Sequence, residues 1–233
     1  MINTIQTLFS KSANKLKCTN IKNKIDDIFQ GVEIDKNVFT QLLLDLKDKE
    51  MIEYFCICLN SKRCEGKFEL TKGSFVQLKE IMEYILKNVT NIEDNYEYIK
   101  YCLILAQTYY YLNGDKKIYI NTSFKHIAML KQREFWEYFF AKNFSDELLN
   151  MKNKSKTNKN NNVFSKVLTL VHNMIDVKVQ KIIIKDIACL LCKQYELDKR
   201  MNKEVMMLIE SYKDEDSVQL CLEKDDVNEV EEI

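Results

Sequence analysis

The sequence predicts an all-α protein, either an irregular multi-helix bundle or a short α-solenoid. The composition gives two observations: the 46% content of hydrophobic residues is ordinary for a globular protein, and the 233 residues include no proline and only four glycines. Sheets built from short strands need turn residues at short intervals, whereas long helices need few. The third indication is periodicity, because apolar residues recur at every third or fourth position over most of the chain. We expect about nine helices.

The centre of the predicted fold runs from Tyr96 to Phe144 and includes the only tryptophan, Trp136. We interpret it as a buried helix over residues 96–112, a turn at Asn113 and Gly114, a short polar connection, and an aromatic-rich helix over residues 135–149. The first helix is apolar on nearly all sides, as expected of a central helix. Residues 118–130 show no clear period. The aromatic face of the second helix is typical of a core, and a peptide-binding groove is the alternative.

Seven further segments show the helical period. Gly31 ends one of them, since glycine easily adopts positive φ, and Asp35, Thr71 and Asp198 are suited to cap the helices that follow them. The charged residues 47–50 permit a break in the third segment. The expected helices cover residues 2–16, 21–29, 38–59 and 71–89 before the centre, and residues 163–175, 179–195 and 199–212 after it.

Two segments lack the pattern. Residues 151–162 read MKNKSKTNKNNN and bury too little apolar surface to order themselves, so we expect a flexible basic loop within a single helical domain over residues 1–213. Residues 214–233 contain nine acidic residues and one basic residue, Lys224. We expect a disordered acidic tail there. Because the net charge of the whole chain is zero, the rest of the chain has the opposite excess, and the tail either covers a basic surface or is a solvated terminus.

Cysteine spacing gives no strong site. Cys189 and Cys192 form a CxxC pattern inside an apolar helical segment, where core packing is the simpler interpretation than zinc or redox chemistry. Cys56, Cys58 and Cys64 are three thiols without a fourth ligand, and whether they bind a metal stays open. We therefore predict no metal and no cofactor.

Catalytic motifs are also missing from the sequence. No nucleophile elbow, P-loop, HExxH or GxGxxG pattern occurs. The two histidines, His126 and His172, are far apart in the sequence, and we interpret both as structural or surface residues. The sequence predicts no catalytic residue and no enzyme.

One family resemblance rests on the central stretch: Leu103 to Tyr110, then Lys117 to Ile120, His126, and Phe135-Trp136-Glu137. This pattern is similar to a helical region of the set-binding-factor pseudophosphatases, which are myotubularin-related proteins with a DENN module, and of some uncharacterised cytosolic proteins. Residues 167–208 are compatible with the end of that region, so the resemblance covers roughly residues 70–210. Nothing here resembles a DENN module, a phosphatase loop or a PH domain. The resemblance implies a helical scaffold or adaptor near membrane trafficking, and it transfers no catalytic residue.

Candidate binding residues are the lysines of the polar segment, Lys152, Lys154, Lys156 and Lys159. The favoured function is a non-catalytic, cytoplasmic helical adaptor that binds a protein partner, such as a small GTPase or a trafficking factor. The alternative is charge-driven binding of nucleic acid or an anionic membrane through the basic body and residues 151–162. Cytoplasmic location is expected because the N-terminus shows no signal peptide and no segment has eighteen uncharged apolar residues.

Overall fold

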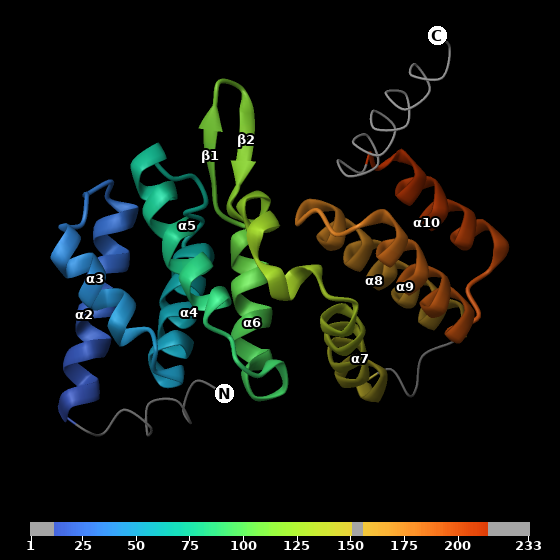
Figure 1. The fold of residues 1–233 in the computed structure, drawn as a ribbon, viewed down its shortest axis with the longest axis horizontal. Helices are drawn as coiled ribbons and strands as arrows, with labels where there is room; N and C mark the ends of the chain where they lie inside the picture. Colours follow the sequence, from blue (N-terminus) through green and yellow to red (C-terminus); the bar gives the residue numbers. More distant parts are fainter. Residues whose placement is uncertain (1–11, 151–155, 214–233) are drawn as a thin grey trace, which may run out of the picture. The chain divides into compact units, whose positions relative to one another are not determined.

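The computed structural model describes residues 12–150 and 156–213. Within them the predicted all-α class is confirmed, with nine α-helices, two 3-10 helices and one small β-hairpin (Figure 1). The chain divides into two compact units, Met1–Ile127 and Ala128–Ile233, which we call the N-terminal unit and the C-terminal unit. The single helical domain over residues 1–213 stays a prediction. Residues 151–155 and the predicted acidic tail, 214–233, lie outside the described residues.

The N-terminal unit contains five described α-helices. Helix α4 packs against both α2 and α6, and α5 packs against α2 and α6. The predicted caps are present at two of these helices: a carboxylate oxygen of Asp35 accepts a hydrogen bond from the amide of Asn37, and the hydroxyl of Thr71 accepts one from the amide of Ser74. The five helices are α2 (Ser12–Phe29), α3 (Lys36–Asp45), α4 (Lys49–Cys64), α5 (Lys72–Lys87) and α6 (Ile92–Ala106).

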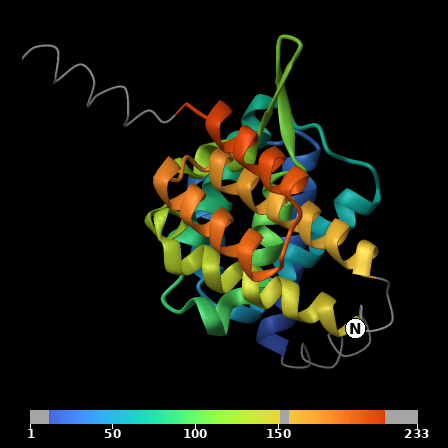
Figure 2. The same ribbon diagram turned by 90° about the vertical axis from the view of Figure 1, so that its right-hand side faces the viewer.

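The helix predicted over residues 96–112 is too long, because α6 ends at Ala106 and a hairpin follows. Strand β1 (Tyr110–Asn113) pairs antiparallel with β2 (Lys116–Tyr119). Consecutive aromatic residues favour extended backbone, and Gly114, at φ +61°, supplies the positive φ that a two-residue hairpin turn requires. The hairpin extends beyond the helices of its unit (Figures 1 and 2).

Backbone pairing and one buried side chain hold the start of the hairpin in place. The amide of Leu70 donates to the carbonyl of Tyr110 at 2.8 Å, and the amide of Tyr110 donates to the carbonyl of Phe68 at 3.1 Å. The hydroxyl of Tyr109, which is completely buried, donates to the carbonyl of Leu59 in α4. A short 3-10 helix, η1 (Ile120–His126), completes the unit in the region where the sequence shows no clear period.

The C-terminal unit begins with a 3-10 helix and continues with four α-helices. Helix α9 packs against α7, α8 and α10, and α8 also contacts α7 and α10. Trp136 is fully buried, and its indole N–H donates to the carbonyl of Leu130 at 2.9 Å. The predicted cap at Asp198 is confirmed, since its carboxylate accepts from the amide of Met201. The elements are η2 (Ala128–Lys131), α7 (Arg133–Asn150), α8 (Lys156–Asp176), α9 (Lys181–Gln194) and α10 (Lys199–Ser211).

The loop predicted over residues 151–162 is wrong for its second half, because residues 156–162 form the beginning of α8. The polar run lacks apolar residues, but the amphipathic segment that follows it packs against α9. Adding residues to an existing helix costs far less than starting one, so the packed part can extend into a polar sequence. Local composition therefore underestimated the length of this helix.

Candidate functional site

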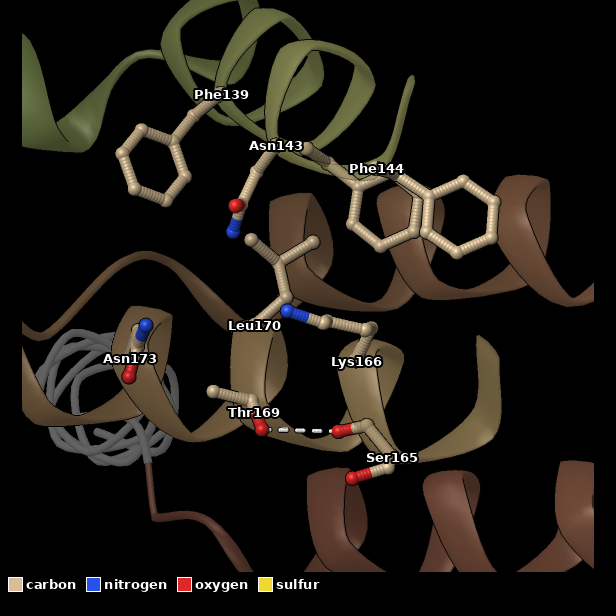
Figure 3. A pocket seen from close by; sticks show the side chains of 9 residues that line it. Phe139, Asn143, Phe144, Ser165, Lys166, Thr169, Leu170 and Asn173 are labelled. Atoms are coloured by element: carbon tan, nitrogen blue, oxygen red, sulfur yellow. Dashed lines mark hydrogen bonds between the residues drawn. The ribbon is translucent and has the colours of Figure 1, made fainter. Parts of the chain in front are cut away.

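A hollow of about 210 Å³ lies between α7 and α8 in the C-terminal unit (Figure 3). We call it the α7–α8 groove. Helix α7 forms one side with four residues, and five residues of α8 form the other. The lining residues are Phe139, Phe140, Asn143, Phe144, Ser165, Lys166, Thr169, Leu170 and Asn173.

The base of the groove is apolar and tightly packed. Phe140 and Phe144 are four residues apart on α7, which places them on one helix face, and their rings stack with centroids 5.3 Å apart. Phe144 also meets the ring of Tyr195 edge-on at 4.7 Å. Leu170 projects from α8 toward α7 (Figure 3) and is only 4% exposed. These contacts hold the base of the groove in one shape.

Polar side chains surround this base. Asn143 projects from α7 into the space between the helices, and the amino group of Lys166 approaches the same space from α8 (Figure 3). The hydroxyl of Thr169 donates to the carbonyl of Ser165 at 2.9 Å, which keeps it close to its own helix. The groove thus combines an apolar base with amide groups and one ammonium group.

The described lining of the groove limits the chemistry that can be assigned to it. Its nine described lining residues include no His, Cys, Asp or Glu. General acid–base catalysis and metal coordination depend mainly on those residue types. The arrangement can hold an apolar group by shape and orient it through amides and a positive charge.

Only two of the four predicted binding lysines lie within the described residues. Lys152 and Lys154 lie outside the described residues. Lys156 and Lys159 fall within the first turns of α8, and their side chains lie outside the described part of the chain. The four lysines therefore stay a prediction as a site, and the structure places a different lysine, Lys166, in the groove.

The sequence did not predict the polar residues of the groove. Only the aromatic face of the helix over residues 135–149 gave a signal, through the alternative of a peptide-binding groove. Asn143, Lys166 and Asn173 stand among many other polar residues in the sequence, and nothing in their spacing distinguishes them. Their grouping depends on which face of α8 meets α7.

The CxxC pattern lies inside a helix, as predicted, with unequal exposure of its two thiols. Cys189 is exposed and Cys192 is buried on α9. Burial raises the pKa of the Cys192 thiol to about 11, with the charge of Cys189 as a smaller cause. A redox-active or metal-binding cysteine needs the opposite shift, toward the thiolate.

Three cysteines noted as possible ligands lie on α4 at different depths. Cys56 is buried, with its sulfur 3.8 Å from that of Cys102, while Cys58 is half-buried and Cys64 is exposed. The hydrogen bond with Cys102, followed by burial, raises the pKa of Cys56 well above its ordinary value. Within the described part of the chain, no three His, Cys, Asp or Glu residues are grouped so that they could hold a metal ion.

Both histidines are exposed, and they belong to different units. His126 ends η1 in the N-terminal unit, and His172 lies on α8 beside Asn173 without lining the groove. The structure therefore does not bring His126 and His172 into one site within either unit.

Comparison of the chain with known protein families, with curated proteins and with solved structures found no match. The resemblance to set-binding-factor proteins consequently stays a prediction from the sequence. Among the helices in residues 12–150 and 156–213, none combines the length and hydrophobicity needed to cross a membrane.

Proposed function

We propose that this chain is a non-catalytic helical adaptor that binds a protein partner through the α7–α8 groove. The observation that carries the proposal is the groove itself, a hollow with an aromatic and aliphatic base and a polar rim. Protein interfaces commonly concentrate their binding energy where one large apolar side chain enters such a pocket and polar contacts surround it.

The size of the groove supports a protein partner over a small-molecule substrate. Pockets that enclose drug-sized ligands and cofactors span roughly 300–1,000 Å³. The groove, at about 210 Å³, has room for little more than one leucine or phenylalanine side chain. A helix or extended segment that inserts one such anchor fits it best.

The cell-biological part of the proposal rests on the sequence alone. The resemblance of residues 70–210 to set-binding-factor proteins supports a cytoplasmic adaptor in membrane trafficking, with a small GTPase or a trafficking factor as partner. The partner's segment would bring an apolar side chain to the groove and hydrogen-bonding or acidic groups to Asn143 and Lys166.

Affinity capture from native cells with matched variants tests the proposal. Asn143→Arg places a long side chain in the groove, and Ala141→Arg places the same residue at an exposed position two residues earlier on α7. We expect one protein to be recovered with the wild type and with Ala141→Arg, and to be reduced at least fivefold with Asn143→Arg. Direct binding of that protein in purified form confirms it. Equal recovery with all three chains would refute the groove as the binding site.

A second candidate function is charge-driven binding of nucleic acid or an anionic membrane. The observation that favours it is the charge of residues 128–213, which contain sixteen Lys and Arg residues against ten Asp and Glu residues. Such binding weakens steeply as salt rises from about 50 to 200 mM, whereas binding through an apolar anchor changes little. A titration of the purified chain with duplex DNA and with phosphatidylserine vesicles at both salt concentrations separates the two functions.

A further inference from the structure

We infer that the open edge of strand β2 is a second binding site, which takes an extended acidic segment of a partner protein as an added β-strand. The site belongs to the N-terminal unit and contains no residue of the α7–α8 groove. The inference therefore goes beyond the proposed function and does not rest on it. The segment that fits has two β-branched residues followed by two acidic residues.

The register of the hairpin decides which backbone groups of β2 point outward. In an antiparallel pair, facing residues alternate between pairs that exchange hydrogen bonds and pairs whose N–H and C=O groups point away from each other's strand. The amide of Ile120 donates to the carbonyl of Tyr109 at 3.2 Å, so these two residues form a pair of the first kind. Lys117 faces Leu112 three positions farther along, and this pair is therefore of the second kind.

The two edges of the hairpin are used differently. On the β1 side, the amide and the carbonyl of Tyr110 pair with residues 68–70. On the β2 side, the carbonyl of Tyr119 accepts from the hydroxyl of Thr122 at 2.7 Å. Within the described residues no further strand lies beside β2, so the amide and carbonyl of Lys117 and the amide of Tyr119 form an open edge. The hairpin extends beyond its helices (Figures 1 and 2), and such an edge is a template for pairing with another chain.

The side chains of β2 determine which strand this edge accepts. Lys116 and Lys117 are exposed, whereas Ile118 and Tyr119 are half-buried. Opposite charges on facing residues stabilise a β-pair, and like charges destabilise it. A strand antiparallel to β2 is therefore best matched when two apolar β-branched residues face the end of β2 and the next two residues, both acidic, face the lysines at its start.

Two other occupants fit the edge less well. A second copy of β2 would bring two more lysines to the same edge, and lysines on edge strands commonly prevent such self-pairing. Single-stranded nucleic acid needs open aromatic faces on which bases can stack. The rings of Tyr110 and Tyr119 lie against each other with centroids 5.4 Å apart, and the ammonium group of Lys117 lies over the ring of Tyr110 at 4.4 Å.

Amide hydrogen exchange of the full chain tests the backbone part of the inference. The probe is the blocked hexapeptide Thr-Val-Val-Glu-Glu-Thr at millimolar concentration, and NMR follows single amides. We expect exchange at Lys117 to slow at least threefold, because its N–H gains a carbonyl partner. The amide of Leu112 is the matched control, since it also points outward but on the β1 edge, and its exchange should stay within twofold.

A charge swap tests the side-chain part, with dissociation constants taken from the shifts of the hairpin amides. Lys116→Glu combined with Lys117→Glu should weaken binding of the acidic probe at least fivefold. The lysine probe Thr-Val-Val-Lys-Lys-Thr should bind this variant at least fivefold more tightly than it binds the wild type, which a misfolded hairpin could not do. Lys199→Glu combined with Lys203→Glu, at exposed positions of α10, should leave binding of the acidic probe within twofold.

Several results would overturn the inference. Unchanged exchange at Lys117, or equal slowing at Lys117 and Leu112, would exclude strand addition to β2. A lysine probe that does not prefer the charge-swapped variant would exclude the pairing of charges. Tighter binding of oligothymidylate than of the acidic probe at the same amides would identify nucleic acid as the occupant. Slower exchange at Lys117 as the protein concentration rises, without any probe, would identify a second copy.

Discussion

The two units differ in how their large buried side chains are packed. In the N-terminal unit, two of the buried polar side chains pair with backbone carbonyls. Ser74, which is 2% exposed, donates to the carbonyl of Ile28, and the hydroxyl of Tyr109 donates to the carbonyl of Leu59. In the C-terminal unit three phenylalanines of α7 leave a hollow against α8.

The two units also differ in how charge is distributed along the chain. The N-terminal unit has eighteen basic and sixteen acidic residues. In the C-terminal unit, residues 128–213 have an excess of six positive charges and residues 214–233 have an excess of eight negative charges, so the two excesses largely cancel. Under the proposed function, the N-terminal unit supports the fold, and the C-terminal unit binds the partner through its hollow. Damage to the first should therefore reduce stability, and damage to the second should reduce binding.

The largest expected effect is on the core of the N-terminal unit. Phe55 on α4 is completely buried, and Phe55→Ala should reduce the free energy of unfolding by about 3–5 kcal/mol, because it removes packed surface and leaves a cavity. Ile57→Ala, on the same helix but 40% exposed, is the control and should cost much less. Urea unfolding followed by circular dichroism measures both. A small loss of unfolding free energy with Phe55→Ala would show that Phe55 is not packed in the core of this unit.

A smaller effect is expected from a single hydroxyl. Tyr109→Phe keeps the ring but removes the donor to the carbonyl of Leu59, and should cost about 1–3 kcal/mol. Tyr101→Phe, at a position 42% exposed, should change the unfolding free energy by less than about 0.5 kcal/mol. The same urea titration compares them. Equal losses of unfolding free energy with Tyr109→Phe and Tyr101→Phe would mean that the buried hydrogen bond does not stabilise the fold.

Replacing two glycines by alanine, one in the hairpin turn and one in α5, should change the free energy of unfolding in opposite directions. Gly114 has φ +61°, so Gly114→Ala should destabilise by about 1–2 kcal/mol. Gly73 lies in the first turn of α5, has no positive φ, and has nothing within 4 Å of an added Cβ. Gly73→Ala should stabilise by about 0.5–1 kcal/mol. The thermal unfolding midpoint should fall with Gly114→Ala and rise with Gly73→Ala. A rise with Gly114→Ala would contradict a positive φ at this turn position.

The smallest expected effect concerns a thiol of the C-terminal unit. The pKa of Cys192, raised to about 11 by burial, means that the folded chain keeps this thiol protonated where the unfolded chain has begun to ionise it. Its contribution to stability is therefore complete below pH 9 and is lost as the pH rises through 11. The fall in the unfolding midpoint between these pH values should be slightly smaller in Cys192→Ala than in the wild type.

Alkylation provides the site-resolved form of that prediction. At pH 8 iodoacetamide should modify the exposed Cys189 well before Cys192, as mass spectrometry of the peptides will show. Faster modification of Cys192 would mean that its thiol is neither buried nor shifted.

The sequence predicted the helical class and the caps because both depend on local patterns. Asp35, Thr71 and Asp198 cap helices where predicted, since a short polar side chain before an apolar period satisfies the first free amides. The hairpin was missed because Tyr109 to Tyr111 continue an apolar run that also suits a helix. Besides its local pairing with β2, strand β1 pairs with residues 68–70, which are far away in the sequence, and no local pattern reports that second pairing.

The groove could be predicted only in part for a similar reason. The aromatic spacing of α7 indicated an apolar face, but whether a neighbouring helix covers that face completely depends on side-chain volumes across two helices. Asn143 and Lys166 are ordinary surface residues in the sequence and become neighbours of one hollow only when α7 and α8 pack. The helical start of α8 at Lys156 likewise depends on packing farther along that helix.

The most direct measurement is the dissociation constant between the full chain and the captured partner, determined by calorimetry for two charge-reversal variants. Lys166→Glu changes the groove, and Lys203→Glu makes the same change at an exposed position on α10. We predict that Lys166→Glu weakens binding at least tenfold and that Lys203→Glu changes it less than twofold. Equal dissociation constants for both variants and the wild type would contradict the assignment of the α7–α8 groove as the binding site.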